Sequence, residues 1–303
     1  MYDIIGDIHG HADKLEELLL KLGYTKKNKE YSHPSRKVLF LGDYIDRGPK
    51  IHETLKIVKH MVDGGHAIAL MGNHEYNAIC FHTKRMKGGY LRKHSIKNIL
   101  QHYKTLKDFN DHQSAYDDYI EWFKTLPLFF EDENFRAVHA CWDHAHINYL
   151  RSLLVNNCLT DHLIANSADK ENKIYHSVEI TLKGKELLLP LGERFNDKDG
   201  NSRANIRIKW WENPATSTYK SISLHPLENL KSDPIVMNDH LKTGHYKEDE
   251  KPVFFGHYWL NGNPMLYRDN ICCCDYSVAK EGVLAAYRYD GEKKLDEGKF
   301  VYV

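Results

Sequence analysis

Five short apolar stretches of this sequence end on aspartate, asparagine or histidine, and this recurrence limits the possible folds more than any other feature. The stretches are residues 2–5, 38–41, 67–71, 135–138 and 253–255. The polar residues that follow them are Asp7 and His9, Asp43, Asn73, His139 and His257. Short runs of this kind are typical of buried β-strands. So many metal-ligand residue types at strand ends indicate one shared site.

Helical periodicity separates the first three of these strands. Leu15, Leu18 and Leu22 recur at helical spacing and stop at Gly23, a typical helix end. A second helix is predicted over residues 54–61. Alternating strands and helices imply parallel strands with right-handed crossovers, the α/β class. Because loops at the carboxyl ends of such strands converge on one crevice, residues far apart along the chain can form one site.

Composition narrows the class of protein further. The chain has 303 residues, of which 42% are hydrophobic and 28% are charged, enough for a packed globular fold. Lysine plus arginine and aspartate plus glutamate each total 42, so the net charge is zero and gives no support to nucleic acid as a partner. No apolar run approaches the roughly 20 residues of a membrane helix, so we expect no membrane association. Six irregularly spaced cysteines and a start without a secretory pattern predict a cytoplasmic protein.

The residue types at the strand ends predict a metal centre. Carboxylate, amide and imidazole ligands without a thiolate favour manganese, iron or zinc. Six such side chains are too many for one tetrahedral site, and a pair of ions about 3.5–4 Å apart can bind a phosphoryl group and activate water. Taken singly, Asp7, Asp43 or Asn73 could simply cap a helix. All six together favour the metal site.

Three motifs carry a family resemblance: GDIHG at residues 6–10, GDYIDRG at 42–48 and GNHE at 72–75. In this order they resemble the signature of the calcineurin-like metallophosphoesterases. The DRG and GNHE details are similar to the phosphoprotein phosphatase branch, which contains bacterial serine/threonine phosphatases and symmetrical diadenosine tetraphosphatases. The resemblance covers about residues 1–140 and 252–303. It implies a two-sheet β sandwich flanked by helices.

The resemblance also implies that the six strand-end residues bind two divalent metal ions. Manganese is the first expectation, with iron or zinc as alternatives. The resemblance assigns Asp7 and His9 to one ion, Asp43 to a bridging position, and Asn73, His139 and His257 to the second ion.

Further residues receive catalytic and substrate-binding roles from the same resemblance. His74 would protonate the leaving oxygen, held in orientation by Asp46, while Arg47 would contact phosphate oxygens. The nucleophile would be a hydroxide activated by the two ions, attacking in line without a phosphoenzyme. Arg207 is a candidate for a second phosphate contact, although it could equally be a strand-surface charge.

Residues 146–250 do not match the phosphatase pattern and are predicted to form a cap inserted within a single domain of residues 1–303. The cap is expected to begin with a helix. Its later part shows β-like alternation at residues 178–182, 187–189 and 206–210.

Two expectations concern the helical segments. Residues 90–126 are predicted to be mostly helical, with one apolar face formed by Ile96, Ile99, Leu100, Tyr103 and Leu106. Several of the 20 histidines lie in polar helical stretches and are predicted to be solvated: His60, His94, His102 and His112.

The first functional hypothesis is a metal-dependent phosphomonoesterase that acts on phosphoserine or phosphothreonine in proteins. The alternative is a dinucleoside polyphosphate hydrolase, in which Trp210, Trp211 or Trp259 stacks on a base or, more simply, packs in the core. A remote alternative is a phosphate-binding protein without turnover. The substrate would accordingly be a phosphorylated protein or a nucleotide, and the oligomeric state is left open.

Overall fold

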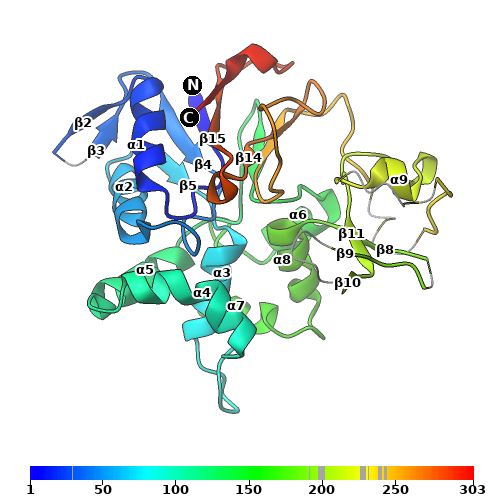
Figure 1. Ribbon diagram of the computed structural model, residues 1–303, viewed down its shortest axis with the longest axis horizontal. Helices are drawn as coiled ribbons and strands as arrows, with labels where there is room; N and C mark the ends of the chain where they lie inside the picture. The colour runs from blue at the N-terminus through cyan, green and yellow to red at the C-terminus, as the bar shows by residue number, and fades with distance from the viewer. Residues whose placement is uncertain are drawn as a thin grey trace.

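Two β-sheets form the centre of the molecule, with helices around them (Figure 1). The computed structural model describes residues 1–28, 30–190, 192–196, 202–225, 230, 232–237, 241 and 244–303. The first sheet has the order β14-β15-β1-β4-β5, with β16 beside β15. Its strands are β1 (Tyr2–Ile5), β4 (Lys37–Phe40), β5 (Ala67–Ala69), β14 (Asp275–Tyr276), β15 (Val283–Tyr289) and β16 (Phe300–Tyr302).

The second sheet has the order β13-β12-β7-β6. Its strands are β6 (Phe129–Glu131), β7 (Arg136–Val138), β12 (Val253–Phe255) and β13 (Ile271–Cys273). The strands β1, β4 and β5 are parallel in one sheet, and β7, β12 and β13 are parallel in the other. All five strands with predicted ligands at their ends are therefore present, and within each sheet they point the same way.

The two sheets pack face to face, which confirms the predicted sandwich. Ile4 and Leu39 of the first sheet share one apolar cluster with Phe135 and Phe254 of the second. The neighbouring residue Ile5 points the other way and packs in the cluster that contains the helices. Because successive strand residues alternate between faces, each sheet is buried on both sides.

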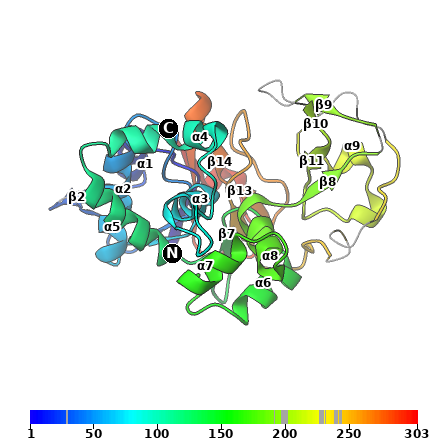
Figure 2. The ribbon, with the colours of Figure 1, turned by 90° about the horizontal axis from the view of Figure 1, so that it is seen from below.

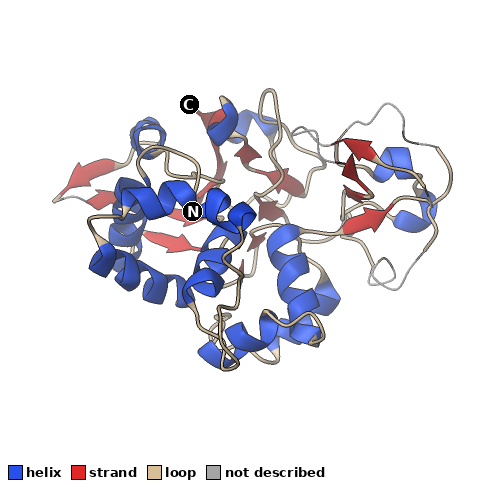
Figure 3. Cartoon of the chain, turned by 60° about the horizontal axis from the view of Figure 1, so that its bottom comes forward, coloured by secondary structure: helices blue, strands red, loops and turns tan. Residues whose placement is uncertain are grey.

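Helices cover the outer faces of the sheets (Figure 3). Three of them follow β1, β4 and β5 as predicted: α1 (Ala12–Lys21), α2 (Ile51–Asp63) and α3 (Asn73–His82). The others in the main body are α4 (Ile96–Asp108), α5 (Gln113–Lys124), α6 (His144–Arg151), α7 (Asp161–Ser167) and α8 (Lys173–Lys183). A small hairpin of β2 (Thr25–Lys27) and β3 (Glu30–Ser32) lies at one edge.

The prediction of β-structure at residues 178–182 is wrong, because these residues lie in α8. Ile174, Val178 and Leu182 recur every four residues and are buried in the main core. Asn172 caps the helix by accepting a hydrogen bond from the Ile174 amide. The apolar residues of this run fit both a two-residue and a four-residue repeat, and the capped helix prevails.

The sequence pattern places the apolar residues of α4 on one face and leaves open where this face points. Its apolar residues face outward: Ile96 is 79% exposed, Leu100 68% and Tyr103 52%. The side chains that α4 buries are His102, 5% exposed, and Thr105, 0% exposed. The expectation that His102 is solvated therefore fails, for a reason that lies in the site described below.

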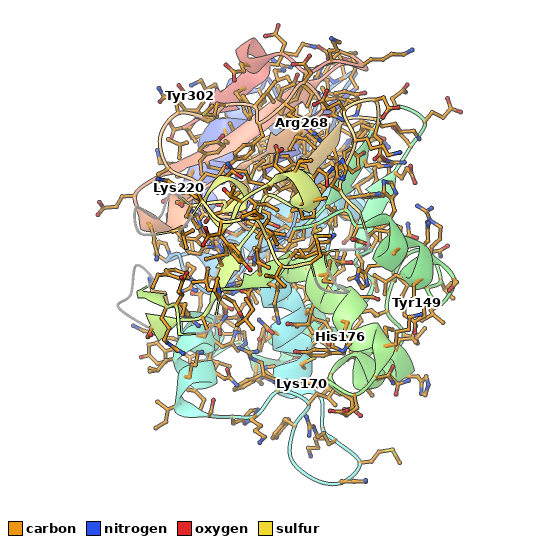
Figure 4. The ribbon with its side chains drawn as sticks, turned by 90° about the vertical axis from the view of Figure 1, so that its right-hand side faces the viewer. Tyr149, Lys170, His176, Lys220, Arg268 and Tyr302 are labelled. Carbon is orange, nitrogen blue, oxygen red and sulfur yellow. The ribbon has the colours of Figure 1, made fainter. Side chains whose placement is uncertain are left out.

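The later part of the segment 146–250 forms a lobe to one side of the sheets (Figure 2). The lobe is defined here by the described residues 186–190, 192–196, 202–225, 230, 232–237 and 241. Its elements are β8 (Glu186–Leu188), β9 (Phe195–Asn196), β10 (Ser202–Arg203), β11 (Asn205–Arg207) and α9 (Tyr219–Ile222). They surround a separate apolar cluster that includes Leu187, Ile206 and Ile222. Figure 4 looks from this side, with Lys220 labelled on the lobe and His176 on α8.

The helices α6 to α8 bury their apolar residues in the main core and not in the lobe. Ile147, Ile164 and Val178 belong to the same cluster as the helices next to the first sheet. Trp210, Trp211 and Leu224 of the lobe also belong to this cluster, while the other buried hydrophobic residues of the lobe pack in their own. The treatment of residues 146–250 as one inserted cap stays a prediction.

Candidate active site

The loops after β1, β4, β7 and β12 meet at one edge of the sandwich. The His9 amide donates a hydrogen bond to the carbonyl of Asp43 at 2.8 Å. The Gly256 amide donates to the carbonyl of His139 at 2.8 Å. The His257 amide contacts both carboxylate oxygens of Asp7, at 3.1 and 3.2 Å, and so connects the two sheets.

Two glycines let the loops after β4 and β5 approach this closely. Gly42 has a φ of 108°, and a Cβ there would lie 2.6 Å from the Gly72 nitrogen. A Cβ on Gly72 would lie 2.2 Å from the Asp43 nitrogen and from its Oδ1. No side chain fits at either position, so glycine is a condition for placing Asp43 beside the next loop.

Asp43 lies between two groups of possible metal ligands. One group is His9, Asp43 and His74, and the other is Asp43, His139 and His257, with the ligand atoms of each group within 4.8 Å of one another. Asp43 Oδ2 is 3.7 Å from His9 Nε2, and Asp43 Oδ1 is 3.4 Å from His139 Nε2. The two carboxylate oxygens therefore face different histidines, as a bridging ligand requires.

The imidazoles are oriented by hydrogen bonds on the far side of their rings. His9 Nδ1 donates to the carbonyl of Ile45 at 2.8 Å, and His139 Nδ1 donates to the carbonyl of Leu41 at 2.9 Å. Each bond directs Nε2 toward Asp43. His9 Nε2 and both ring nitrogens of His257 are buried without a hydrogen-bond partner among the described residues. Buried polar atoms without a partner are costly, and a bound cation would satisfy them.

Asp7 and Asn73 complete the set. Burial and the nearby carboxylates of Asp275 and Asp43 raise the pKa of Asp7 well above its usual value. Crowded buried carboxylates of this kind are stabilised by a cation. Asn73 Oδ1 lies 3.1 Å from His139 Nε2. The structure thus brings all six predicted ligands together, and their oxygen and imidazole donors fit a pair of divalent ions.

Two of the three predicted histidine ligands, His9 and His257, favour the neutral form. Burial alone would lower the pKa of His139, but the charge of Asp43 outweighs it and raises the pKa. Burial and the nearby charge of His74 lower the pKa of His9 to about 3. Burial and the charge of Arg207 lower the pKa of His257 well below its usual value. A neutral imidazole has a free lone pair, so both rings are ready to bind a cation without first losing a proton.

His74 and Asp46 form a buried pair. His74 Nδ1 lies 2.5 Å from Asp46 Oδ2, and His74 Nε2 lies 3.9 Å from Asp43 Oδ2. Burial alone would lower the pKa of His74, but Asp43 and Asp46 outweigh it and raise the pKa. His74 therefore favours its protonated form and presents Nε2 beside the ligand groups.

Glu75, the last residue of the GNHE motif, fixes the backbone around Asp43. Its side chain is fully buried, and it accepts hydrogen bonds from three backbone amides. Those of Asp43 and Gly72 reach Oε2 at 2.9 and 3.0 Å, and that of Tyr44 reaches Oε1 at 2.8 Å. One carboxylate thereby ties the loop after β4 to the start of α3.

The sequence analysis missed His102, which reaches Asp46 from α4. His102 Nδ1 lies 2.6 Å from Asp46 Oδ1, and Thr105 Oγ1 donates to the same oxygen at 2.6 Å. A signal for this pair was present in the sequence. His102 and Thr105 are three residues apart, so they share one face of α4, opposite its exposed apolar residues.

Arg47 and Trp259 lie beside the ligand groups. The Arg47 guanidinium carbon is 5.4 Å from the Trp259 ring centroid, and the Trp259 ring is 5.4 Å from the His9 ring. Arg47 Nε is buried and has no hydrogen-bond partner in the described part of the chain. Lys280 lies on the same indole, 5.0 Å from its centroid. The edge of the site therefore combines an aromatic ring with two cations.

The lobe brings Arg207 near the site from β11. The charge of Arg207 contributes to the low pKa of His257. Arg207 is therefore close enough to His257 to influence its charge, although the two residues are far apart along the chain. Trp210 and Trp211 are 2% and 1% exposed and pack on Phe255, so they belong to the core. Of the three candidate tryptophans, Trp259 is the one with a partly exposed ring.

A paired-sheet fold with histidine and aspartate at its strand ends defines the class of phosphoesterases that act through metal ions. Residues 2–257 match the calcineurin-like phosphoesterase family, and the chain belongs to it.

Two relatives with nucleotide substrates in their names are similar over part of the chain. The asymmetrical bis(5'-nucleosyl)-tetraphosphatase PrpE of Oceanobacillus iheyensis is 34% identical over 141 residues, covering 46% of this chain and 54% of that protein. A symmetrical bis(5'-nucleosyl)-tetraphosphatase of Psychromonas ingrahamii is 34% identical over 139 residues, covering 45% of this chain and 42% of that protein. The chain thus spans about half the length of these curated relatives.

A solved structure supports the fold. The serine/threonine phosphatase of Saccharomyces cerevisiae with similarity to human phosphatase PP5 superposes with a TM-score of 0.50 at 12% identity, covering 100% of this chain and 78% of that one. Within the described residues, no helix is both long and apolar enough to cross a membrane.

Proposed function

We propose that this chain hydrolyses dinucleoside polyphosphates at a centre of two divalent metal ions. One observation carries the proposal. Arg47 lies against the ring of Trp259, and this ring lies against His9, which belongs to one of the groups of possible metal ligands. A guanidinium suits phosphate oxygens, and an indole suits a purine base. The names of the two tetraphosphatase relatives support the same substrate class.

The ligand assignment follows the geometry around Asp43. In this proposal Asp43, which belongs to both groups of possible ligands, would be shared by the two ions. His9, His139 and His257 would help to hold them, together with Asp7 and Asn73. Manganese is our first choice, with iron and zinc as alternatives. Two ions held here would neutralise phosphate charge and supply an activated water.

The protein groups carry out binding and proton transfer. Arg47 binds the non-bridging oxygens of the phosphate under attack, and Arg207 binds a further phosphate from the lobe. His74 holds a proton on Nε2 and delivers it to the leaving oxygen, while Asp46 keeps Nδ1 occupied. A nucleotide leaving group needs less protonation than a serine alcohol, because the second ionisation of a phosphate ester has a pKa of about 6.

The competing function is a protein phosphatase, which was the first hypothesis from the sequence. The likeness to the yeast phosphatase supports the fold alone. A phosphopeptide would have no base to place against Trp259. We therefore rank the dinucleotide above the phosphoprotein.

The test is hydrolysis by metal-stripped protein restored separately with Mn²⁺, Fe²⁺ or Zn²⁺. We expect diadenosine tetraphosphate to be consumed, and chromatography of the products to give either two diphosphates or a triphosphate with a monophosphate. A phosphoserine peptide serves as the parallel substrate. Phosphate release from the peptide with the dinucleotide intact would overturn the proposal in favour of the protein phosphatase.

A further inference from the structure

Helix α4 packs with its polar side toward the protein. Burying apolar surface is worth about 25 cal/mol per Å², so a helix normally turns its leucines and isoleucines inward. Here Ile96 and Leu100 are exposed while His102 and Thr105 are buried. The orientation runs against the hydrophobic pattern of the helix, and the bonds made by the buried pair must account for it.

Those bonds end on one carboxylate. Asp46 Oδ1 receives both His102 Nδ1 and Thr105 Oγ1 at 2.6 Å, and Asp46 Oδ2 faces His74 Nδ1 at 2.5 Å. Each carboxylate oxygen of Asp46 therefore has its own hydrogen-bond partners. The α4 pair fixes one oxygen, and the carboxylate plane then directs the other at His74.

The His102 ring is itself fixed at both nitrogens. Its Nε2 lies 2.6 Å from the hydroxyl of Tyr116, on α5. Tyr116 is buried and stacks on Phe109 with ring centroids 4.9 Å apart. Because both ring nitrogens are used, the imidazole has one favoured orientation.

We propose that His102 is a positioning residue: with Thr105 and Tyr116 it holds Asp46 so that His74 presents Nε2 to the leaving group. His102 touches neither the substrate nor the ligand groups and acts through Asp46. The inference rests on the proposed role of His74 as proton donor. It adds a chain of contacts from α5 through α4 to the reaction centre.

The main test compares leaving groups in the metal-loaded enzyme. His102→Leu fills the space but removes the bond to Asp46, while His102→Asn keeps a donor near the position of Nδ1. General acid catalysis typically raises the rate 10²–10⁴-fold, and partial misalignment of His74 should lower the rate about tenfold. We expect His102→Leu to lower kcat about tenfold on phenyl phosphate, to leave 2,4-dinitrophenyl phosphate little changed, and to leave KM unaltered. His102→Asn should recover most of the loss.

A double-mutant cycle with His74→Asn separates this inference from the proposed function. Residues in one hydrogen-bonded network are coupled, so adding His102→Leu to His74→Asn should cost nothing further. If His74→Asn itself shows no dependence on the leaving group, the proton-donor role of His74 fails. If His74→Asn shows the dependence and His102→Leu lowers both substrates equally, the positioning role alone is overturned.

Two further measurements keep the inference testable. If His102→Leu does not fold, Thr105→Val and Tyr116→Phe each remove one hydroxyl and should give a smaller loss with the same leaving-group dependence. Proton NMR should show a downfield His74 Nδ1 resonance that moves upfield in these variants. An unmoved resonance would contradict the proposal. Leu100→Gln, on the exposed side of the same helix, is the matched control and should change neither readout.

Discussion

The ligand loops and the helix α4 serve the same site but are placed by different forces. The loops follow directly from the sheets, since Asp7, Asp43 and His257 come directly after parallel strands whose order fixes where they meet. Helix α4 is placed by tertiary contacts, with Asp46 as the anchor of His102. Local sequence therefore determines the ligands, while the groups that orient them depend on packing between distant elements.

The lobe is a third case. Most of its buried apolar residues form their own cluster around Ile206 and Ile222, while Trp210, Trp211 and Leu224 pack in the main core. A change inside the lobe's own cluster should therefore leave the ligand loops in place. The comparison predicts a graded response. Substitutions in the ligand loops should abolish turnover, and substitutions around His74 should lower the rate for poor leaving groups. Substitutions at the rim or in the lobe should change substrate binding.

The largest effect is expected for Asp43→Asn. Loss of the shared carboxylate removes a ligand from both groups, and since even residues outside the ligand set commonly cost 10–100-fold, turnover should fall by more than about 100-fold. Metal analysis should show fewer than two ions per chain. Asp13→Asn, at an exposed position of α1, is the control. Full metal content with normal turnover would show that Asp43 is not a ligand of the metal centre.

His74→Asn should be the next largest change. We expect both metal ions to remain bound while hydrolysis of substrates with poor leaving groups falls by about 10²–10⁴-fold, the usual contribution of a general acid. Steady-state kinetics together with metal analysis provides the measurement. Loss of metal along with activity would instead make His74 a ligand, as its place beside His9 and Asp43 would allow.

Trp259→Leu should affect binding more than chemistry. Stacking on a base is worth about 1–3 kcal/mol, so the KM for diadenosine tetraphosphate should rise about tenfold. Trp259→Phe keeps an aromatic ring and should retain most of the affinity. A chromogenic monoester has no base, and its KM is the internal comparison. An equal rise for both substrates would show that Trp259 supports Arg47 and does not read the base.

The smallest effect on chemistry is expected for Ile206→Ala in the lobe, paired with Ile4→Ala in the sandwich. Both remove the same atoms from a buried position, which typically costs 2–5 kcal/mol. Hydrogen exchange should accelerate within the lobe for Ile206→Ala and throughout the chain for Ile4→Ala. Monoester turnover should survive the lobe change. Global unfolding by Ile206→Ala would mean that the lobe is not a separate unit.

The sequence was informative where local pattern and topology agree. The strand order carries the loops to one edge, so the positions of Asp7, Asn73 and His139 follow from their place after a strand. His102 was misread as solvated because its partner, Asp46, lies far away along the chain, and the two short bonds to Asp46 fix the orientation of α4. Helix α8 was misread because a short run of branched residues satisfies two periods.

The hydrogen bonds of Glu75 affect how quickly a metal-free site can bind ions again. Its carboxylate holds the backbone of Asp43 and Tyr44 to that of Gly72, within the protein itself. The spacing of the loops after β4 and β5 is therefore maintained by the polypeptide and does not depend on the ions. A stripped site of this kind has little rearrangement to complete, so metal uptake should be fast, with a rate that follows ion concentration.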